Sequence, residues 1–242
     1  MKYIIFSDIH SNLEAIEAFD RAVQFIEHDK KVCLGDIVGY NADPNFAVDW
    51  VRKEVDLALA GNHDYAVLKK TDTTYFNSAA KRACTWTQEV LTEINKKFLD
   101  TLPIQKTEDN IFWVHSSPFE PAKWHYVSTE ANAVENFDYF SQDICFLGHS
   151  HLPRIFEKNE KGEVLSHEAS RLELESKSRY IINVGSLGQP RDGNSDLAFV
   201  CYDSVGQVAE FYRFPYDFPV TQEKIRTCGL PSYLADRLSD GQ

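Results

Sequence analysis

The sequence predicts an α/β protein in which β-sheets pack together and helices cover their outer faces. Before Pro153, short apolar runs alternate with amphipathic segments of helical period, which is typical of parallel strands joined by helices. After Pro153, short runs of alternating polarity are separated by turn residues, which is typical of antiparallel strands. Several apolar runs also end at residues able to bind a metal ion, as strands do at the functional edge of an α/β sheet.

The first predicted unit is a strand followed by a helix. Residues 2–7 are predicted to form the first buried strand, and Ser11 with Glu14 has the Ser-x-x-Glu form of a capping box. We therefore expect a helix to begin at Ser11. Its apolar residues recur at steps of three and four, so one face should lie on the sheet. They are Leu13, Ile16, Phe19, Val23 and Ile26.

The second and third strands follow the same plan. The apolar run 32–34 stops just before Asp36, which places this aspartate at a strand tip. Asp43 and Pro44 predict the start of a second amphipathic helix, and residues 56–60 form the next strand. These elements predict three parallel strands.

The rest of the chain completes the prediction. Residues 76–98 have helical spacing closed by Pro103, so we expect a helix there that packs on the sheet or forms a cap. Two further apolar runs end at His115 and Gly148. The half after Pro153 is expected to form a second, mostly antiparallel sheet, with strands at residues 154–157, 179–184, 197–202 and 208–214. From about residue 221, the sequence predicts a tail of two short helices, to which no function can be assigned.

Composition and charge limit the class of protein. A chain of 242 residues with 43% hydrophobic content suits a single domain spanning residues 1–242. Its net charge of -12 disfavours nucleic acid as a partner. No segment approaches the length of a membrane span, and the five cysteines include no Cys-x-x-Cys pair. These features predict a soluble cytoplasmic protein with reduced thiols, and nothing in them indicates the oligomeric state.

Eight polar residues at the predicted strand ends form a candidate site: Asp8, His10, Asp36, Asn62, His63, His115, His149 and His151. Their oxygen and nitrogen donors suit manganese, iron, zinc, cobalt or nickel, and the absence of cysteine argues against a structural zinc site. Two ions held about 3.5–4 Å apart need a shared carboxylate, for which Asp36 is the candidate. Any one of these residues alone is better explained by capping or core hydrogen bonding, but their coincidence at strand ends favours a site.

Five motifs follow one another along the chain: Asp8-Ile9-His10, Gly35-Asp36-Ile37-Val38-Gly39, Gly61-Asn62-His63-Asp64, His115, and Gly148-His149-Ser150-His151. Their identity and order resemble those of the calcineurin-like metallophosphoesterase superfamily. Residues 188–193 and 229–231 also resemble a bacterial branch of small phosphoesterases that is grouped by similarity with diadenosine tetraphosphatases. This resemblance implies a four-layer α/β/β/α sandwich, in which two packed mixed β-sheets lie between helices and two metal ions lie at the strand ends.

The resemblance also implies a role for each candidate. Asp8, His10 and His151 would hold one divalent ion, Asn62, His115 and His149 the other, and Asp36 both. Manganese is the preferred ion, with iron, zinc, cobalt and nickel as alternatives. His63 would stabilise or protonate the leaving group, with Asp64 orienting its imidazole, after attack by a hydroxide that bridges the ions.

Two further residues are candidates for substrate binding. Arg191 lies in a turn, where its guanidinium either holds a phosphate by two parallel hydrogen bonds or stays solvated. Asn12 either contacts the substrate or caps the first helix, and capping is slightly favoured. Ser116 and the loop 40–44 depart from the family pattern, and both could reshape the pocket mouth.

The sequence therefore predicts a metal-dependent hydrolase of a small phosphorylated molecule, with a nucleotide as the favoured substrate. A dinucleoside polyphosphate hydrolase is a narrower form of this prediction. A protein Ser/Thr phosphatase ranks lower because the chain is compact for a broad peptide groove, and the acidic charge opposes a nuclease. A non-catalytic scaffold with the same fold would be expected to lack ligands or His63, and none is missing.

Overall fold

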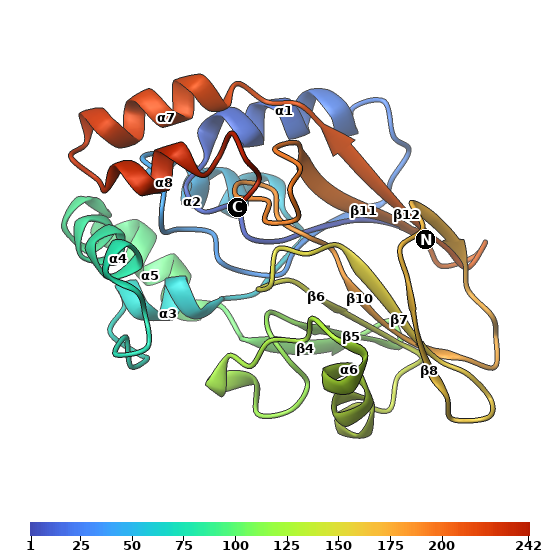
Figure 1. The fold of residues 1–242 in the computed structure, drawn as a ribbon. Helices are drawn as coiled ribbons and strands as arrows, with labels where there is room; N and C mark the ends of the chain where they lie inside the picture. Colours follow the sequence, from blue (N-terminus) through green and yellow to red (C-terminus); the bar gives the residue numbers. More distant parts are fainter.

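The computed structural model describes residues 1–242 as two mixed β-sheets of six strands each, packed face to face between helices (Figure 1). The strand order is β3-β2-β1-β11-β12-β9 in the first sheet and β4-β5-β6-β10-β7-β8 in the second. The α/β/β/α sandwich implied by the family resemblance is therefore confirmed.

The elements have the following bounds. The first sheet contains β1 (Lys2–Phe6), β2 (Lys30–Cys33), β3 (Leu57–Ala58), β9 (Arg171–Glu173), β11 (Leu197–Asp203) and β12 (Val208–Phe214). The second contains β4 (Gln105–Glu108), β5 (Ile111–Val114), β6 (Ile144–Leu147), β7 (Arg154–Lys158), β8 (Val164–His167) and β10 (Arg179–Asn183). The helices are α1 (Leu13–Val23), α2 (Pro44–Glu54), α3 (Asn62–Val67), α4 (Ser78–Val90), α5 (Glu93–Thr101), α6 (Glu130–Asn136), α7 (Phe218–Thr227) and α8 (Ser232–Asp236).

Side chains alternate along β1 because successive residues of a strand point to opposite faces. Ile4 and Phe6 belong to the cluster beneath the outer helices, whereas Tyr3 and Ile5 belong to the cluster between the two sheets. Phe6 packs against Phe19 of α1, with ring centroids 4.7 Å apart. The central strand is thus buried on both faces, which explains why residues 3–6 are apolar without alternation.

Helices cover both outer faces of the sandwich. Figure 1 shows α1 and α7 outside the first sheet and α6 outside the second. A third cluster, which includes Phe112 of β5, Ala133 of α6 and Phe137, forms the core under α6. None of the helices has the length and apolar character needed to cross a lipid bilayer.

The strands after Pro153 do not form a sheet of their own, so this expectation is wrong. β11 pairs antiparallel with β1 and extends the first sheet, whereas β10 pairs parallel with β6 and extends the second. Alternating polarity identifies a strand but not its partner, because partner choice depends on contacts between distant parts of the chain.

The predicted capping box at the start of α1 is also wrong. Asn12, not Ser11, is the N-cap residue, and its side chain accepts a hydrogen bond from the Ala15 backbone N–H. Glu14 instead accepts a hydrogen bond from Thr221 and forms an ion pair with Lys224. The carboxylate therefore links α1 to α7 instead of closing a capping box.

The helix expected over residues 76–98 is two helices, α4 and α5. Leu91 is extended, and Thr92 accepts a hydrogen bond from the Asn95 N–H as the N-cap of α5. The apolar period continues across this break, so spacing alone did not reveal it. The two-helix tail is confirmed as α7 and α8, with α7 beginning at Phe218.

Candidate metal centre

The strand ends of both sheets meet at one place, and all eight candidate residues lie there. Asp8 and His10 follow β1, Asp36 follows β2, Asn62 and His63 begin α3, His115 follows β5, and His149 and His151 follow β6. None of the eight is more than 6% exposed. The structure thus brings together side chains that are far apart in the sequence.

Asp8, His10 and His151 form one group of possible ligands. The Asp8 Oδ1 atom lies 3.2 Å from His151 Nε2 and 3.7 Å from His10 Nε2. The two Nε2 atoms are 3.2 Å apart. One ligand atom from each residue lies within 4.8 Å of the others, so the three can surround a single cation.

Asp36, His115 and His149 form a second group beside the first. The Asp36 Oδ2 atom lies 3.5 Å from His115 Nε2 and 3.7 Å from His10 Nε2 of the first group. Asn62 adds an amide oxygen 3.3 Å from His115 Nε2. Asp36 therefore lies between the groups, and the arrangement can hold two cations that share one carboxylate.

Backbone carbonyl groups determine which imidazole nitrogen faces the centre. The Nδ1 atoms of His10, His115 and His151 contact the carbonyl oxygens of Val38, Leu34 and Gln189, respectively. A carbonyl oxygen only accepts, so each Nδ1 carries a proton, and each Nε2 presents its lone pair when the imidazole is neutral, as it must be to bind a metal ion. His149 has the opposite orientation, because its Nε2 donates to the Trp124 carbonyl.

Burial keeps most of these imidazoles neutral. It lowers the pKa of His149 to about 3, with His115 adding to the effect, and it lowers the pKa of His151. His115 differs because Asp36 outweighs burial and raises the His115 pKa to about 9. Against the effect of burial, the histidines led by His115 hold the pKa of Asp36 well below its usual value. Neutral imidazoles and ionised carboxylates are the forms that bind metal ions.

Two features of the centre fit divalent cations. The Asp8 Oδ1 atom is buried and has no hydrogen-bond partner, a state that a cation would relieve. The Nε2 atoms of His10 and His151 face each other, and because both protons lie on Nδ1, their lone pairs repel unless a cation shares them. The mixed oxygen and nitrogen donors suit the transition metals expected from the sequence.

The backbone at the centre is strained. Five candidate ligands that are not glycine have φ between 49° and 65°: Asp8, His10, Asp36, His149 and His151. L-residues with side chains adopt this left-handed region at a cost, and such residues concentrate at functional sites. This observation supports the same centre independently of residue type.

His63 lies beside Asp36, and its backbone N–H donates to Asp36 Oδ1 at 2.8 Å. Its ring is enclosed by Tyr40 and Phe76, with centroids 4.4 and 4.9 Å away. The Nδ1 atom is buried without a hydrogen-bond partner, and burial lowers the His63 pKa to about 4. The ring is therefore held in place by packing.

Asp64 does not orient His63, so this expectation is wrong. The Asp64 carboxylate accepts hydrogen bonds from the backbone N–H groups of Ile37, Val38 and Gly61. It thus joins the loop after β2 to the start of α3. Asp64 supports the backbone that carries Asp36 instead of contacting the imidazole.

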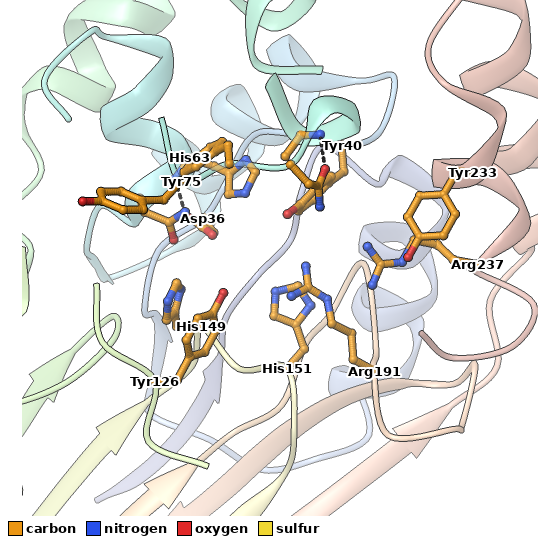
Figure 2. Close-up of a pocket in the computed structure, with 14 residues that line it drawn as sticks. Asp36, Tyr40, His63, Tyr75, Tyr126, His149, His151, Arg191, Tyr233 and Arg237 are labelled. Carbon is orange, nitrogen blue, oxygen red and sulfur yellow. Dashed lines mark hydrogen bonds between the residues drawn. The ribbon is translucent and has the colours of Figure 1, made fainter. Parts of the chain in front are cut away.

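Of the two expected substrate-binding residues, only Arg191 reaches the pocket. Asn12 is fully buried, since its Oδ1 caps α1 and its Nδ2 donates to the Gly188 carbonyl, so capping is the role that the structure supports. Arg191 lines a cavity of about 220 Å³ in front of the centre (Figure 2). Ser116 is buried away from this cavity, whereas Tyr40 lines it.

Several residues of this pocket carry no signal in the sequence. Tyr126, Tyr75 and Phe76 come from loops, and Tyr233 and Arg237 come from the tail. Figure 2 shows the three tyrosines and Arg237 around the histidines and Asp36. The Tyr126 ring also stacks on His149, with centroids 4.2 Å apart. No motif marks these residues, because their position depends on how the loops and the tail fold.

The chain was compared with known proteins. A family model described as a calcineurin-like phosphoesterase superfamily domain matches residues 1–205, ending before α7 and α8. An uncharacterized protein of Methanocaldococcus jannaschii is 39% identical over 243 residues, which cover 98% of this chain and 97% of the relative. A crystal structure of a metallophosphoesterase from Sphaerobacter thermophilus is 34% identical, with a TM-score of 0.89 and coverage of 100% and 99%. A hypothetical protein from Pyrococcus horikoshii, 17% identical with a TM-score of 0.80 and coverage of 100% and 98%, shares the fold.

Proposed function

The chain belongs to the calcineurin-like phosphoesterase superfamily, and from this premise we propose that it is a metal-dependent hydrolase of a small phosphorylated molecule. The observation that carries the proposal is the position of Asp36, whose carboxylate lies between two groups of buried histidines. A non-catalytic scaffold would not need to retain so many strained, buried and polar residues in one place.

We assign the ligands by their position in the two groups. Asp8, His10 and His151 would hold one ion, Asn62, His115 and His149 the other, and Asp36 both. Mixed oxygen and nitrogen donors suit several transition metals, among which we take manganese as the first candidate, ahead of iron, zinc, cobalt and nickel. When bound, two such cations activate a water molecule and neutralise charge on the phosphoryl group.

The surrounding residues would position the substrate and exclude water. His63 lies beside Asp36 at the inner end of the pocket, where its N–H can stabilise the leaving oxygen. Because Tyr40 and Phe76 enclose the ring, His63 needs no carboxylate to orient it. Arg191 reaches the same pocket, where its guanidinium can bind an anionic group of the substrate.

The size and lining of the pocket support a small substrate, and we favour a nucleotide. A cavity of about 220 Å³ is small for a folded protein partner. Tyr75, Tyr126 and Tyr233 line it and are 93%, 53% and 53% exposed, respectively. Exposed aromatic faces beside a phosphate site offer stacking surfaces for a nucleobase.

Hydrolysis of p-nitrophenyl phosphate and of bis(p-nitrophenyl) phosphate with added manganese tests the proposal. We expect turnover of at least one ester by the wild type. Asp36→Asn should lower this turnover by more than about 100-fold. Mutation of residues that only hydrogen-bond to metal ligands already lowers metal affinity or activity by about 10–100-fold, and Asp36 is proposed as a ligand itself. The bound manganese of each protein should be measured in parallel. Asp138→Asn is a matched control, since Asp138 is exposed and pairs with Lys158.

Each outcome has a defined meaning. Turnover of the monoester alone would identify a phosphatase, and turnover of the diester would identify a phosphodiesterase. Folded wild type with bound manganese and no turnover of either ester would favour the non-catalytic scaffold. Full activity of Asp36→Asn would exclude Asp36 as the shared ligand.

A further inference from the structure

The pocket contains two arginines, which come from different parts of the chain. Arg191 follows β10, and Arg237 directly follows α8 in the tail. Both line the cavity in front of the metal centre. Figure 2 shows their guanidinium groups on the same side of the pocket, turned toward its interior. The two charges disfavour each other. Burial lowers the pKa of Arg237, and the positive charge of Arg191 lowers it further.

Neither guanidinium group forms an ion pair with an Asp or Glu side chain. Arg191 donates from Nε and Nη2 to the Oε1 atom of Gln189, and its charge lies 5.6 Å from the centre of the Tyr40 ring. Arg237 donates from Nε to a main-chain oxygen of Gln242, the terminal residue, where that oxygen is part of a carboxylate, and lies 5.3 Å from the centre of the Tyr233 ring. These contacts orient the two side chains. Arg191 has no acidic partner, and Arg237 has no acidic side chain as a partner, so both can turn donors toward an anion in the pocket.

Two neighbouring arginines without an acidic side-chain partner are unusual in this chain, which has 37 acidic and 25 basic residues. Elsewhere, Arg213 and Arg226 form ion pairs with Asp192 and Asp236. Within the pocket, Asp36 is the one acidic lining residue, and the proposed function commits it to the metal ions. Two neighbouring positive charges in a partly enclosed site repel each other, and an anion between them removes that cost.

The position of Arg237 is set by a packed element. Leu234 and Ala235 of α8 are fully buried in a cluster with Tyr40 and Ile225. Lys224 of α7 forms ion pairs with Glu14 and Asp43, which ties the tail to α1 and to the start of α2. The tail therefore forms a fixed wall of the pocket.

We infer that Arg191 and Arg237 form a second anion subsite, and that the substrate carries a phosphate group in addition to the one that is hydrolysed. This inference rests on the proposed function, because the metal centre is taken to hold the scissile phosphate. It assigns a role to the tail, which would select substrates with two phosphate groups over those with one.

The test compares adenosine 5′-monophosphate with adenosine 3′,5′-bisphosphate as competitive inhibitors of p-nitrophenyl phosphate hydrolysis, with manganese in excess. The two probes share a base and a ribose, so stacking contributes equally to both. Since a hydrogen bond to a charged group is worth about 1.5–3 kcal/mol, we expect the wild type to bind the bisphosphate about 10-fold or more tightly than the monophosphate. Arg237→Gln should reduce this preference to less than about 3-fold, and Arg237→Lys should restore part of it.

Arg226→Gln is the matched control, because it removes the same charge from the tail at a position outside the pocket. It should keep the full preference. Equal preferences in Arg237→Gln and Arg226→Gln, with p-nitrophenyl phosphate still hydrolysed, would overturn the subsite and leave the proposed function standing. If no variant hydrolyses the ester, the proposed function fails, and the thermal shifts caused by the two probes in the manganese-loaded proteins decide the subsite separately.

Discussion

Single backbone contacts prepare each buried histidine of the centre for its role. Because the Nδ1–H of His10 donates to the Val38 carbonyl, its Nε2 is left with a lone pair that faces Asp36 and Asp8. The same holds for His115 and the Leu34 carbonyl. Residue type and spacing identified these histidines, but the choice of nitrogen depends on carbonyl groups that only the folded loops bring close.

His63→Ala should keep its bound metal while losing turnover. The ring is packed between Tyr40 and Phe76 beside the centre, and a group that assists the leaving oxygen contributes about 100-fold or more. The measurements are bound manganese and kcat for p-nitrophenyl phosphate.

The control for this variant is His167→Ala. His167 pairs with Glu157 on β7 and lies outside the pocket, so both quantities should match the wild type. His63 also lies close enough to His10 and Asp36 to form a possible ligand group with them. Loss of both ions from His63→Ala would therefore make His63 a ligand and remove it from its catalytic role.

At the scale of elements, the loop after β2 and the start of α3 approach each other closely. A Cβ atom at Gly61 would lie 2.1 Å from Asp36 Oδ1 and 2.5 Å from the Asp36 backbone nitrogen. A Cβ atom at Gly39 would lie 2.5 Å from His63 Nδ1. The glycines of these two motifs thus leave room for the functional side chains next to them.

Gly61→Ala should destabilise the protein and disturb the centre. Forcing a methyl group against backbone atoms costs about 1–3 kcal/mol, and the displaced carboxylate would no longer be shared by both groups. We expect a lower Tm and less than the wild-type amount of bound manganese. Gly206→Ala is the control, because the nearest neighbours of its added atom are side-chain atoms of Asp203, at 3.0 Å, and of Val208, at 3.8 Å, and not backbone atoms. A wild-type metal content in Gly61→Ala would show that the loop can adjust.

Elements with strong periodicity were predictable, and short ones were not. β6 and β12 lie where the apolar runs placed them, because their patterns continue over the whole strand. β8 and β9 are short edge strands in which apolar residues form no period long enough to give a signal. α3 was not expected because its sequence, Asn-His-Asp, is also typical of a turn.

At the scale of the whole molecule, the centre could be predicted before the sheets were known. The motif residues follow buried strands, and the ends of such strands converge whichever sheet they join. The division of the later strands between two sheets could not be predicted, since it depends on pairings such as β1 with β11. The pocket wall escaped prediction for the same reason, because Arg237 reaches it only through the packing of α8.

The buried centre should also make the metal-free protein sensitive to acid. Burial lowers the folded-state pKa of His63 to about 4 and of His149 to about 3, and it lowers those of His10 and His151. Below pH 6.5 the unfolded chain binds protons at these histidines and the folded protein does not. The free energy of unfolding therefore decreases as the pH is lowered. Each such group contributes up to about 1.4 kcal/mol per pH unit.

Asp64 opposes this trend, because burial, followed by the nearby Asp36, raises its folded-state pKa to about 7. The folded protein then binds one more proton there than the unfolded chain as the pH falls from about 7 to 4, which offsets about one histidine. The Tm of metal-free protein, followed by circular dichroism, should therefore drop steeply between pH 6.5 and 4.5. His149→Asn removes one of the buried groups and should give a shallower slope. A Tm independent of pH over this range would show that the folded centre takes up protons as readily as the unfolded chain.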